Sequence, residues 1–230
     1  TCPRCARCRS TSARCGLSAT LNAASTLNST AGTLALTKAN SIYAIDKNLS
    51  LQGAGAINIS GTITTGNGTL NTSSGTFTLS GDNTYGGLTT VASGILNIRH
   101  NNALGTTAAG TTVNNGATLQ MQDNITVGNE VLTLNGVGFG SAGVLNNISG
   151  NNEWAGTTNL ATATTIGMTA GTLSLTNPNA IAAGTSAAGA SAAGAAPAAP
   201  GNTTPSTPNP PPMDTLASLG RPFLSMAVSS

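Results

Sequence analysis

A short phrase that recurs seven times between residues 32 and 175 constrains the fold of this chain more than any other feature. Each phrase opens with glycine and then sets apolar residues among polar ones: GTLAL (32–36), GAINI (55–59), GTFTL (75–79), GILNI (94–98), GATLQM (116–121), GVLNNI (143–148) and GTLSL (171–175). Successive glycines are 23, 20, 19, 22, 27 and 28 residues apart. A repeat of this length is typical of a solenoid, in which each unit buries its apolar face only when neighbours stack on it.

The period within each phrase indicates which kind of solenoid this is. Ile57 and Ile59 flank Asn58, and Phe77 and Leu79 flank Thr78, so apolar and polar residues alternate as in a strand with one buried face. Further short strands are predicted between the phrases, each bounded by Gly or Asn turn formers: LTTV (88–91), TTV (111–113), NITV (124–127) and TTIG (164–167). Several strands of three to five residues per coil favour a β-helix, in which stacked asparagines would satisfy one another's amides at the turns. An ordinary β-sandwich is the alternative, but its strands are usually longer and its hairpins do not require near-constant spacing.

Composition divides the chain into three segments. All four cysteines lie within residues 1–15, where four arginines stand without an acid, and residues 4–177 contain no proline. We therefore predict an unstructured Cys/Arg-rich leader (1–20), a β-helix body (21–178) and a low-complexity Ala/Gly/Pro-rich linker or tail (179–230). The formal charge is +4 in the leader and −2 in the body.

Charge and hydropathy exclude several classes of protein. Charged residues make up 6% of the chain and the formal net charge is +2, so no basic surface is available to bind nucleic acid. No run of about 18 apolar residues occurs, so no transmembrane helix is predicted.

The run GTFTLSGDNTYGGLTTVASGILNIRHNNALG (75–105) resembles the autotransporter-associated β-strand repeat, also called the passenger-associated transport repeat. The matching residues are Gly75, Leu79, Ser80, Gly81, Asn83, Thr84, Tyr85, Gly87, Thr89, Val91, Gly94, Leu96, Ala103, Leu104 and Gly105. Phe77 replaces a leucine of the family pattern and Ser93 an alanine. The stretch from Leu132 to Leu175 is similar to coils that follow such repeats, so further coils are expected over 111–176.

This resemblance implies a right-handed parallel β-helix of about seven coils within the passenger of a type V secretion protein of a Gram-negative bacterium. Such a segment assists export and folding of the passenger at the outer membrane, is displayed on the cell surface or secreted, and carries no catalytic residues or cofactor. The implied partners are a translocator barrel, which we do not expect within this chain, and a host-surface or glycan ligand of an adhesin-like surface. Because the chain starts without Met or a charged-then-apolar signal, we expect a fragment, a cleaved product or a wrongly bounded reading frame.

The cysteines are the first candidate for a metal site. Cys2, Cys5 and Cys8 are spaced as in some iron–sulfur and zinc motifs, with Cys15 following. The fourth cysteine lies too far on for a bacterial cluster motif, and two separated pairs, as in zinc sites, are absent. We expect these cysteines to belong to the unstructured leader and predict no metal or cofactor.

The acids of the body are the candidate catalytic groups of a β-helical polysaccharide lyase or hydrolase. Glu130 and Glu153 are 23 residues apart, so adjacent coils would be able to stack them, and Asp123 lies nearby. Without an Asp-Asp or Asp-x-Asp cluster, and with Arg99 and His100 the nearby bases, we interpret these acids as scattered solubilising charges at turns.

The remaining candidates are His100, expected to be solvent-exposed, and the isolated aromatics Tyr85 and Trp154. Either aromatic could belong to a carbohydrate platform, but capping of a coil end is the favoured interpretation. The sequence thus predicts no enzyme and no catalytic, cofactor-binding or metal-binding residue. Its functional prediction is a structural, adhesin-like surface segment; a glycan-binding or polysaccharide-degrading β-helix is the alternative.

Overall fold

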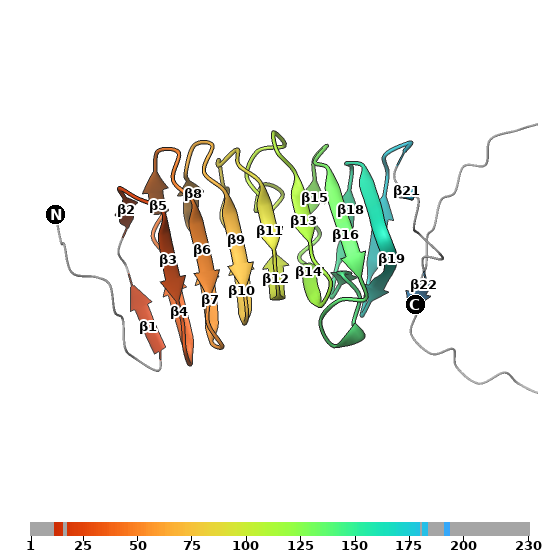
Figure 1. Ribbon diagram of the computed structural model, residues 1–230, viewed down its shortest axis with the longest axis horizontal. Helices are drawn as coiled ribbons and strands as arrows, with labels where there is room; N and C mark the ends of the chain where they lie inside the picture. The colour runs from red at the N-terminus through yellow and green to blue at the C-terminus, as the bar shows by residue number, and fades with distance from the viewer. Residues whose placement is uncertain (1–11, 16–17, 180, 184–190, 194–230) are drawn as a thin grey trace, which may run out of the picture.

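The computed structural model describes residues 12–15, 18–179, 181–183 and 191–193. Over these residues the chain is an all-β parallel solenoid of about seven turns, stacked into a rod (Figure 1). The one helical element among them is the 3-10 turn η1 (Phe139–Ser141). None of the described residues forms a helix long and apolar enough to cross a membrane.

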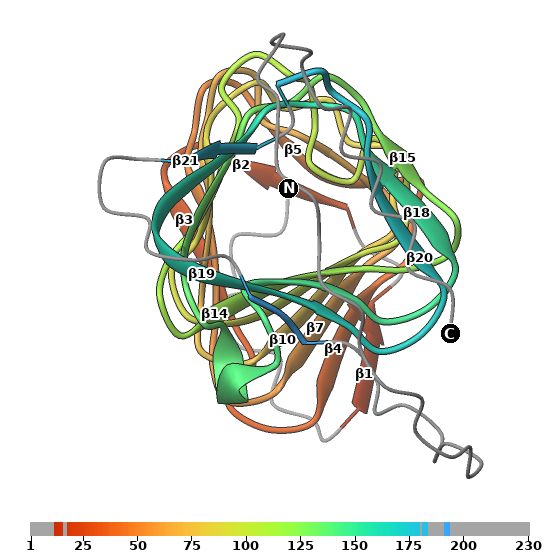
Figure 2. The same cartoon turned by 90° about the vertical axis from the view of Figure 1, so that its right-hand side faces the viewer.

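Successive coils superimpose when the rod is viewed along its axis, and their strands form three faces (Figure 2). The first face contains β1 (Ser12–Cys15), β4 (Thr33–Leu36), β7 (Ala56–Ile59), β10 (Thr76–Leu79), β12 (Gly94–Ile98), β14 (Ala117–Met121) and β17 (Leu145–Asn147). The second contains β3 (Ser25–Asn28), β6 (Leu49–Gln52), β9 (Leu70–Ser73), β11 (Thr89–Val91), β13 (Thr111–Val113) and β16 (Leu132–Gly136). The long strand β19 (Thr158–Met168) runs from the second face to the first, and β21 (Ile181–Ala183) and β22 (Ser191–Ala193) pair with it.

The third face consists of two separate three-stranded sheets. One contains β2 (Ala19–Leu21), β5 (Asn40–Ala44) and β8 (Thr62–Thr64), and the other contains β15 (Thr126–Val127), β18 (Asn151–Trp154) and β20 (Thr172–Leu175). Between the two sheets lie the SGDNTY and NNALG sequences, which form turns and irregular structure. These two sequences, which resemble the autotransporter-associated repeat, therefore lie where the third face has no strand.

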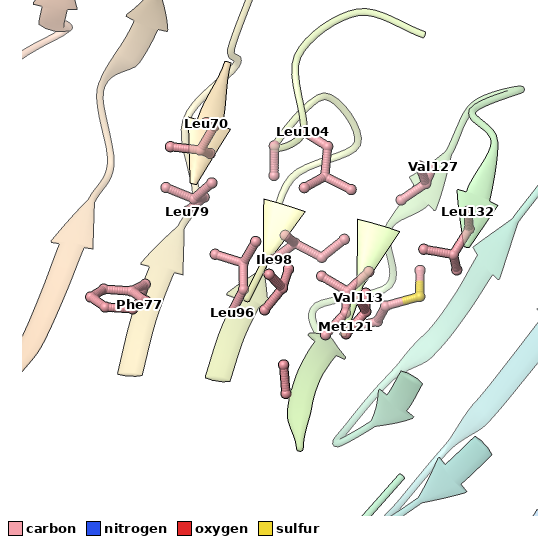
Figure 3. Close-up of a cluster of buried hydrophobic side chains, with 14 of the residues drawn as sticks. Leu70, Phe77, Leu79, Leu96, Ile98, Leu104, Val113, Met121, Val127 and Leu132 are labelled. Carbon is pink, nitrogen blue, oxygen red and sulfur yellow. The ribbon is translucent and has the colours of Figure 1, made fainter. Parts of the chain in front are cut away.

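Parallel pairing in register places like side chains above one another inside the rod. Phe77 lies opposite Ile57 on one side and Leu96 on the other, and the same alignment continues along the first face. These residues are buried (Figure 3), whereas of the residues between them Asn58 is exposed and Thr78 is half-buried. Burying each large apolar side chain stabilises the fold by about 1.5–3 kcal/mol, so a narrow apolar column suffices with few aromatics.

The predicted strands are confirmed, but the seventh phrase lies on a different face from the other six. The first six phrases form β4, β7, β10, β12, β14 and β17 on the first face, whereas GTLSL forms β20 on the third face and pairs with β18. On the first face Leu145 lies opposite Ile166, which belongs to the TTIG segment. No glycine, asparagine or proline interrupts residues 160–166, so β19 continues from one face to the next without a turn.

Strands also extend beyond the predicted limits of the body. β1 lies within residues 1–20, where we expected an unstructured leader, and β21 and β22 lie within the predicted tail. Cys15 ends β1 opposite Leu36. Cys2, Cys5 and Cys8 lie outside the described residues, as does most of the tail.

Candidate functional site

Asn83, in the SGDNTY sequence, joins three successive coils. Its Oδ1 accepts a hydrogen bond from the backbone N–H of Ile63 at 2.8 Å, and its Nδ2 donates to the carbonyl of Ala103 at 2.6 Å. Asn83 is buried, so each of these backbone groups would lack a partner without it. An amide suits this position because its oxygen accepts from one coil while its NH2 group donates to the other.

Tyr85 and Gly105 form the next contact of the same motif. Tyr85 is fully buried, and its hydroxyl is hydrogen-bonded to Thr89 Oγ1 at 2.8 Å. Gly105 has φ +81°, and a β-carbon at this position would overlap the carbonyl of Tyr85 and contact its ring. The tyrosine of one coil and the glycine of the next therefore fit together because the glycine has no side chain.

Asn152, in the second sheet of the third face, holds a backbone group of the previous coil and two groups of its own coil. Its Oδ1 accepts the N–H of Ile125 at 2.7 Å, and its Nδ2 donates to the carbonyl of Ser149 and to Asn147 Oδ1. Asn147 in turn donates to the carbonyls of Gly150 and Ala170. These two asparagines bond chiefly to backbone groups, which the turns leave unpaired. The predicted bonding between stacked amides occurs elsewhere, where Asn97 Nδ2 donates to Oε1 of the in-register Gln120 at 3.4 Å.

Glu130 is an interior acid. Its side chain is 2% exposed, its Oε1 accepts the hydroxyl of Thr111 at 2.5 Å, and its backbone carbonyl accepts Trp154 Nε1 at 3.0 Å. Burial raises the pKa of Glu130 to about 7, and the hydrogen bond from Thr111 lowers it in part. The pKa of Tyr85 is also raised, first by its own burial and then by the negative charge of Glu130. The interpretation of Glu130 as a solubilising charge at a turn is wrong, because this residue is buried.

The structure does not stack Glu130 and Glu153 as a pair. The register places Glu153 opposite Thr126, and its carboxylate accepts the hydroxyls of Thr126 at 3.3 Å and Thr176 at 2.7 Å. These hydrogen bonds lie at the outer surface, whereas Glu130 faces the interior. An acid and a base working on one substrate must both reach it, and these two acids do not share a face.

The other charged candidates also have partners at the surface. Asp123 is paired with Arg99 at 2.7 Å, and both side chains are partly exposed. His100 is partly buried rather than fully exposed, and its Nδ1 accepts the N–H of Asn102 at 3.1 Å. Within the part of the chain that the structure describes, no group of three or more His, Cys, Asp or Glu side chains is placed to hold a metal ion.

The two aromatics considered for a carbohydrate platform are both interior. Tyr85 and Trp154 are fully buried, so neither can contact a ligand at the surface. Sequence reasoning passed over Tyr43, which is 48% exposed on β5. The signal was present, since Ile42 and Ala44 face inward and the alternation directs the residue between them outward.

No family model, no curated protein and no solved structure matches this chain. The solenoid itself is therefore the guide to function. Its polar interior groups hold neighbouring coils together, and its outer faces carry mostly uncharged polar side chains.

Proposed function

We propose that this chain is a structural β-helical segment of an autotransporter passenger, which assists export and folding of that passenger and presents an adhesin-like surface outside the cell. The observation that carries the proposal is the role of Asn83. This residue belongs to the family-like sequence, and both ends of its amide hold backbone groups of adjacent coils. The sequence that resembles the repeat family therefore coincides with contacts that a stacking unit needs.

Coil-by-coil stacking supports a role in export. Parallel pairing joins each strand to the equivalent strand of the previous and the next coil, as β10 pairs with β7 and β12. Each completed coil thus exposes an edge on which the following coil can pair. A chain that emerges from a pore one segment at a time can fold in this order without waiting for distant residues.

The placement of the acids supports a structural role more than a catalytic one. Glu130 is enclosed, Glu153 is hydrogen-bonded to two threonines, and Asp123 is paired with Arg99. No observation on the described residues favours the polysaccharide-degrading alternative.

Export can be tested by placing this chain between an export signal and a type V translocator barrel in a Gram-negative host. The readout is the fraction of fusion protein on intact cells that is accessible to antibody and resists external protease. We expect wild type to be displayed in a resistant form and Asn83→Ala to be displayed less or digested, because its coils lose two buried hydrogen bonds. Asn58→Ala, which changes an exposed asparagine of β7, is the matched control and should behave as wild type.

The proposal fails if the wild-type fusion is displayed no better than a barrel that carries a Gly/Ser linker of equal length. It also fails if Asn83→Ala and Asn58→Ala are displayed and digested alike, because inter-coil contacts would then not contribute to export.

A further inference from the structure

The sheet of β2, β5 and β8 presents an outward column of side chains on the third face. Tyr43 lies in register with Thr20 on one side and Thr64 on the other. Thr84 continues the column, with its hydroxyl oxygen 3.0 Å from that of Thr64. A tyrosine ring thus stands between threonines in a column of outward side chains that follows the axis of the rod at the strand spacing of about 4.8 Å.

Two shallow hollows flank this ring, and both are lined by Thr20 and Tyr43. One has a volume of about 340 Å³, with Ser18, Asn40 and Thr64 in its wall. The other has a volume of about 280 Å³, with Asn22, Ile45 and Lys47 in its wall. We call the outward surface of Thr20, Asn40, Tyr43, Ile45, Lys47 and Thr64 the Tyr43 face.

We propose that the Tyr43 face binds an extended acidic polysaccharide lying along the rod, with one sugar ring stacked on Tyr43. The face of an aromatic ring is electronegative and attracts the C–H bonds on the flat side of a pyranose. Tyrosine supplies this contact area at a low cost in conformational entropy. The hydroxyls of Thr20 and Thr64 and the amide of Asn40 can donate to and accept from sugar hydroxyls on either side.

The spacing and the charge of this face specify the class of glycan. Outward side chains repeat along this face at the strand spacing, which is comparable to the repeat of the sugars in an extended, ribbon-like polysaccharide. Lys47 lines the second hollow, while the neighbouring acid Asp46 accepts the N–H of Asn67 at 2.7 Å. A lysine in the wall of the same hollow as Tyr43 favours a sugar that carries a carboxylate.

This binding is a property of the folded coils, so it does not depend on the export role proposed above. A negative result in the export assay would therefore not contradict polysaccharide binding, which is measured separately on purified protein.

The test measures binding of the full-length chain, folded by circular dichroism, to immobilised polymannuronate, to its neutral ester and to hyaluronan. We expect wild type to bind at least one of the two acidic polysaccharides, and Tyr43→Ala to bind that polysaccharide about tenfold more weakly while Tyr43→Phe is unchanged. Lys47→Ala should weaken binding to the acidic chain, and the neutral ester should bind wild type more weakly than polymannuronate does. Phe139→Ala is the matched control: Phe139 is 53% exposed but lies in η1, outside both hollows, so its removal should have no effect.

Three results would overturn the proposal. The first is no binding of wild type to either acidic polysaccharide. The second is equal binding by wild type and Tyr43→Ala, and the third is an equal loss in Phe139→Ala, which would indicate non-specific adsorption through exposed aromatics. Equal binding of polymannuronate and its ester, with no effect of Lys47→Ala, would overturn the assignment to an acidic glycan.

Discussion

Replacement of Glu130 by glutamine should change how the stability of the solenoid depends on pH. The wild-type carboxyl is enclosed and accepts the hydroxyl of Thr111, and burial raises its pKa from 4.5 to about 7. Glutamine has nearly the same shape, keeps an oxygen to accept the Thr111 hydroxyl, and carries no titratable proton.

Whether the free energy of unfolding rises or falls with pH depends on which state, folded or unfolded, binds the proton of Glu130 more tightly. Between pH 4.5 and pH 7 folded Glu130 retains a proton that the unfolded chain releases, so the free energy of unfolding falls as pH rises through this interval. The stabilising contribution of Glu130 to the free energy of unfolding is therefore complete below pH 4.5 and lost above pH 7. A rise in pKa from 4.5 to about 7 corresponds to a loss of about 3 kcal/mol.

The assay is urea unfolding of wild type and Glu130→Gln at pH values from 4.5 to 8. We expect the two proteins to be similar at the acid end and the variant to be more stable at pH 8, by up to about 3 kcal/mol less the cost of burying its extra amide proton. Glu153→Gln, which removes the same charge at the outer surface, is the control for the loss of a negative charge alone. A difference between wild type and Glu130→Gln that is constant across this range, or that grows toward low pH, would refute the reasoning.

Three further substitutions or modifications test other contacts. Asn83→Leu should lower the free energy of unfolding by about 3 kcal/mol in urea titration, because two buried backbone groups lose their partner. Thr158→Val should leave it unchanged or raise it by about 1 kcal/mol, since this buried hydroxyl has no hydrogen-bond partner among the described residues. Of the Asn-Gly pairs, Asn115 should deamidate faster than Asn135, as measured by peptide mapping after incubation at pH 8. The side-chain amide of Asn135 and the N–H of Gly136 are both hydrogen-bonded, whereas Asn115 is exposed in a turn. Equal rates at these two sites would contradict this ranking.

The architecture could be predicted because its signals are local in the sequence. Alternation around Ile57 and Phe77 sets the direction of side chains, and the spacing of the glycines sets the length of a coil. The face on which a strand lies is not local, since it depends on which strand it pairs with. GTLSL has the same pattern as the other phrases, so its place on the third face became clear only from its register with β18.

The candidate site was less predictable, because burial depends on contacts between distant residues. Glu130 follows Gly-Asn, which is typical of an exposed turn, but Trp154 and Gly156 of the next coil cover its backbone. Nothing near Glu130 in the sequence signals this. Tyr43 is the opposite case. The apolar residues Ile42 and Ala44 on either side of it predict that both face inward and that Tyr43 faces outward. Its exposure is therefore predictable from the sequence.

The in-register stacking of the coils also determines how this rod would respond to tension. Phe77 lies opposite Leu96, nineteen residues later, and strands on one face repeat this arrangement along much of the rod. A pull on one end of the chain would therefore load the hydrogen bonds of the terminal coil first, while the coils behind it stay intact. A coil of nineteen residues that peels away frees about 65 Å of extended chain, and the longer coils free more. The segment would then lengthen in steps of roughly one coil, as a tether that yields gradually instead of breaking at a single load.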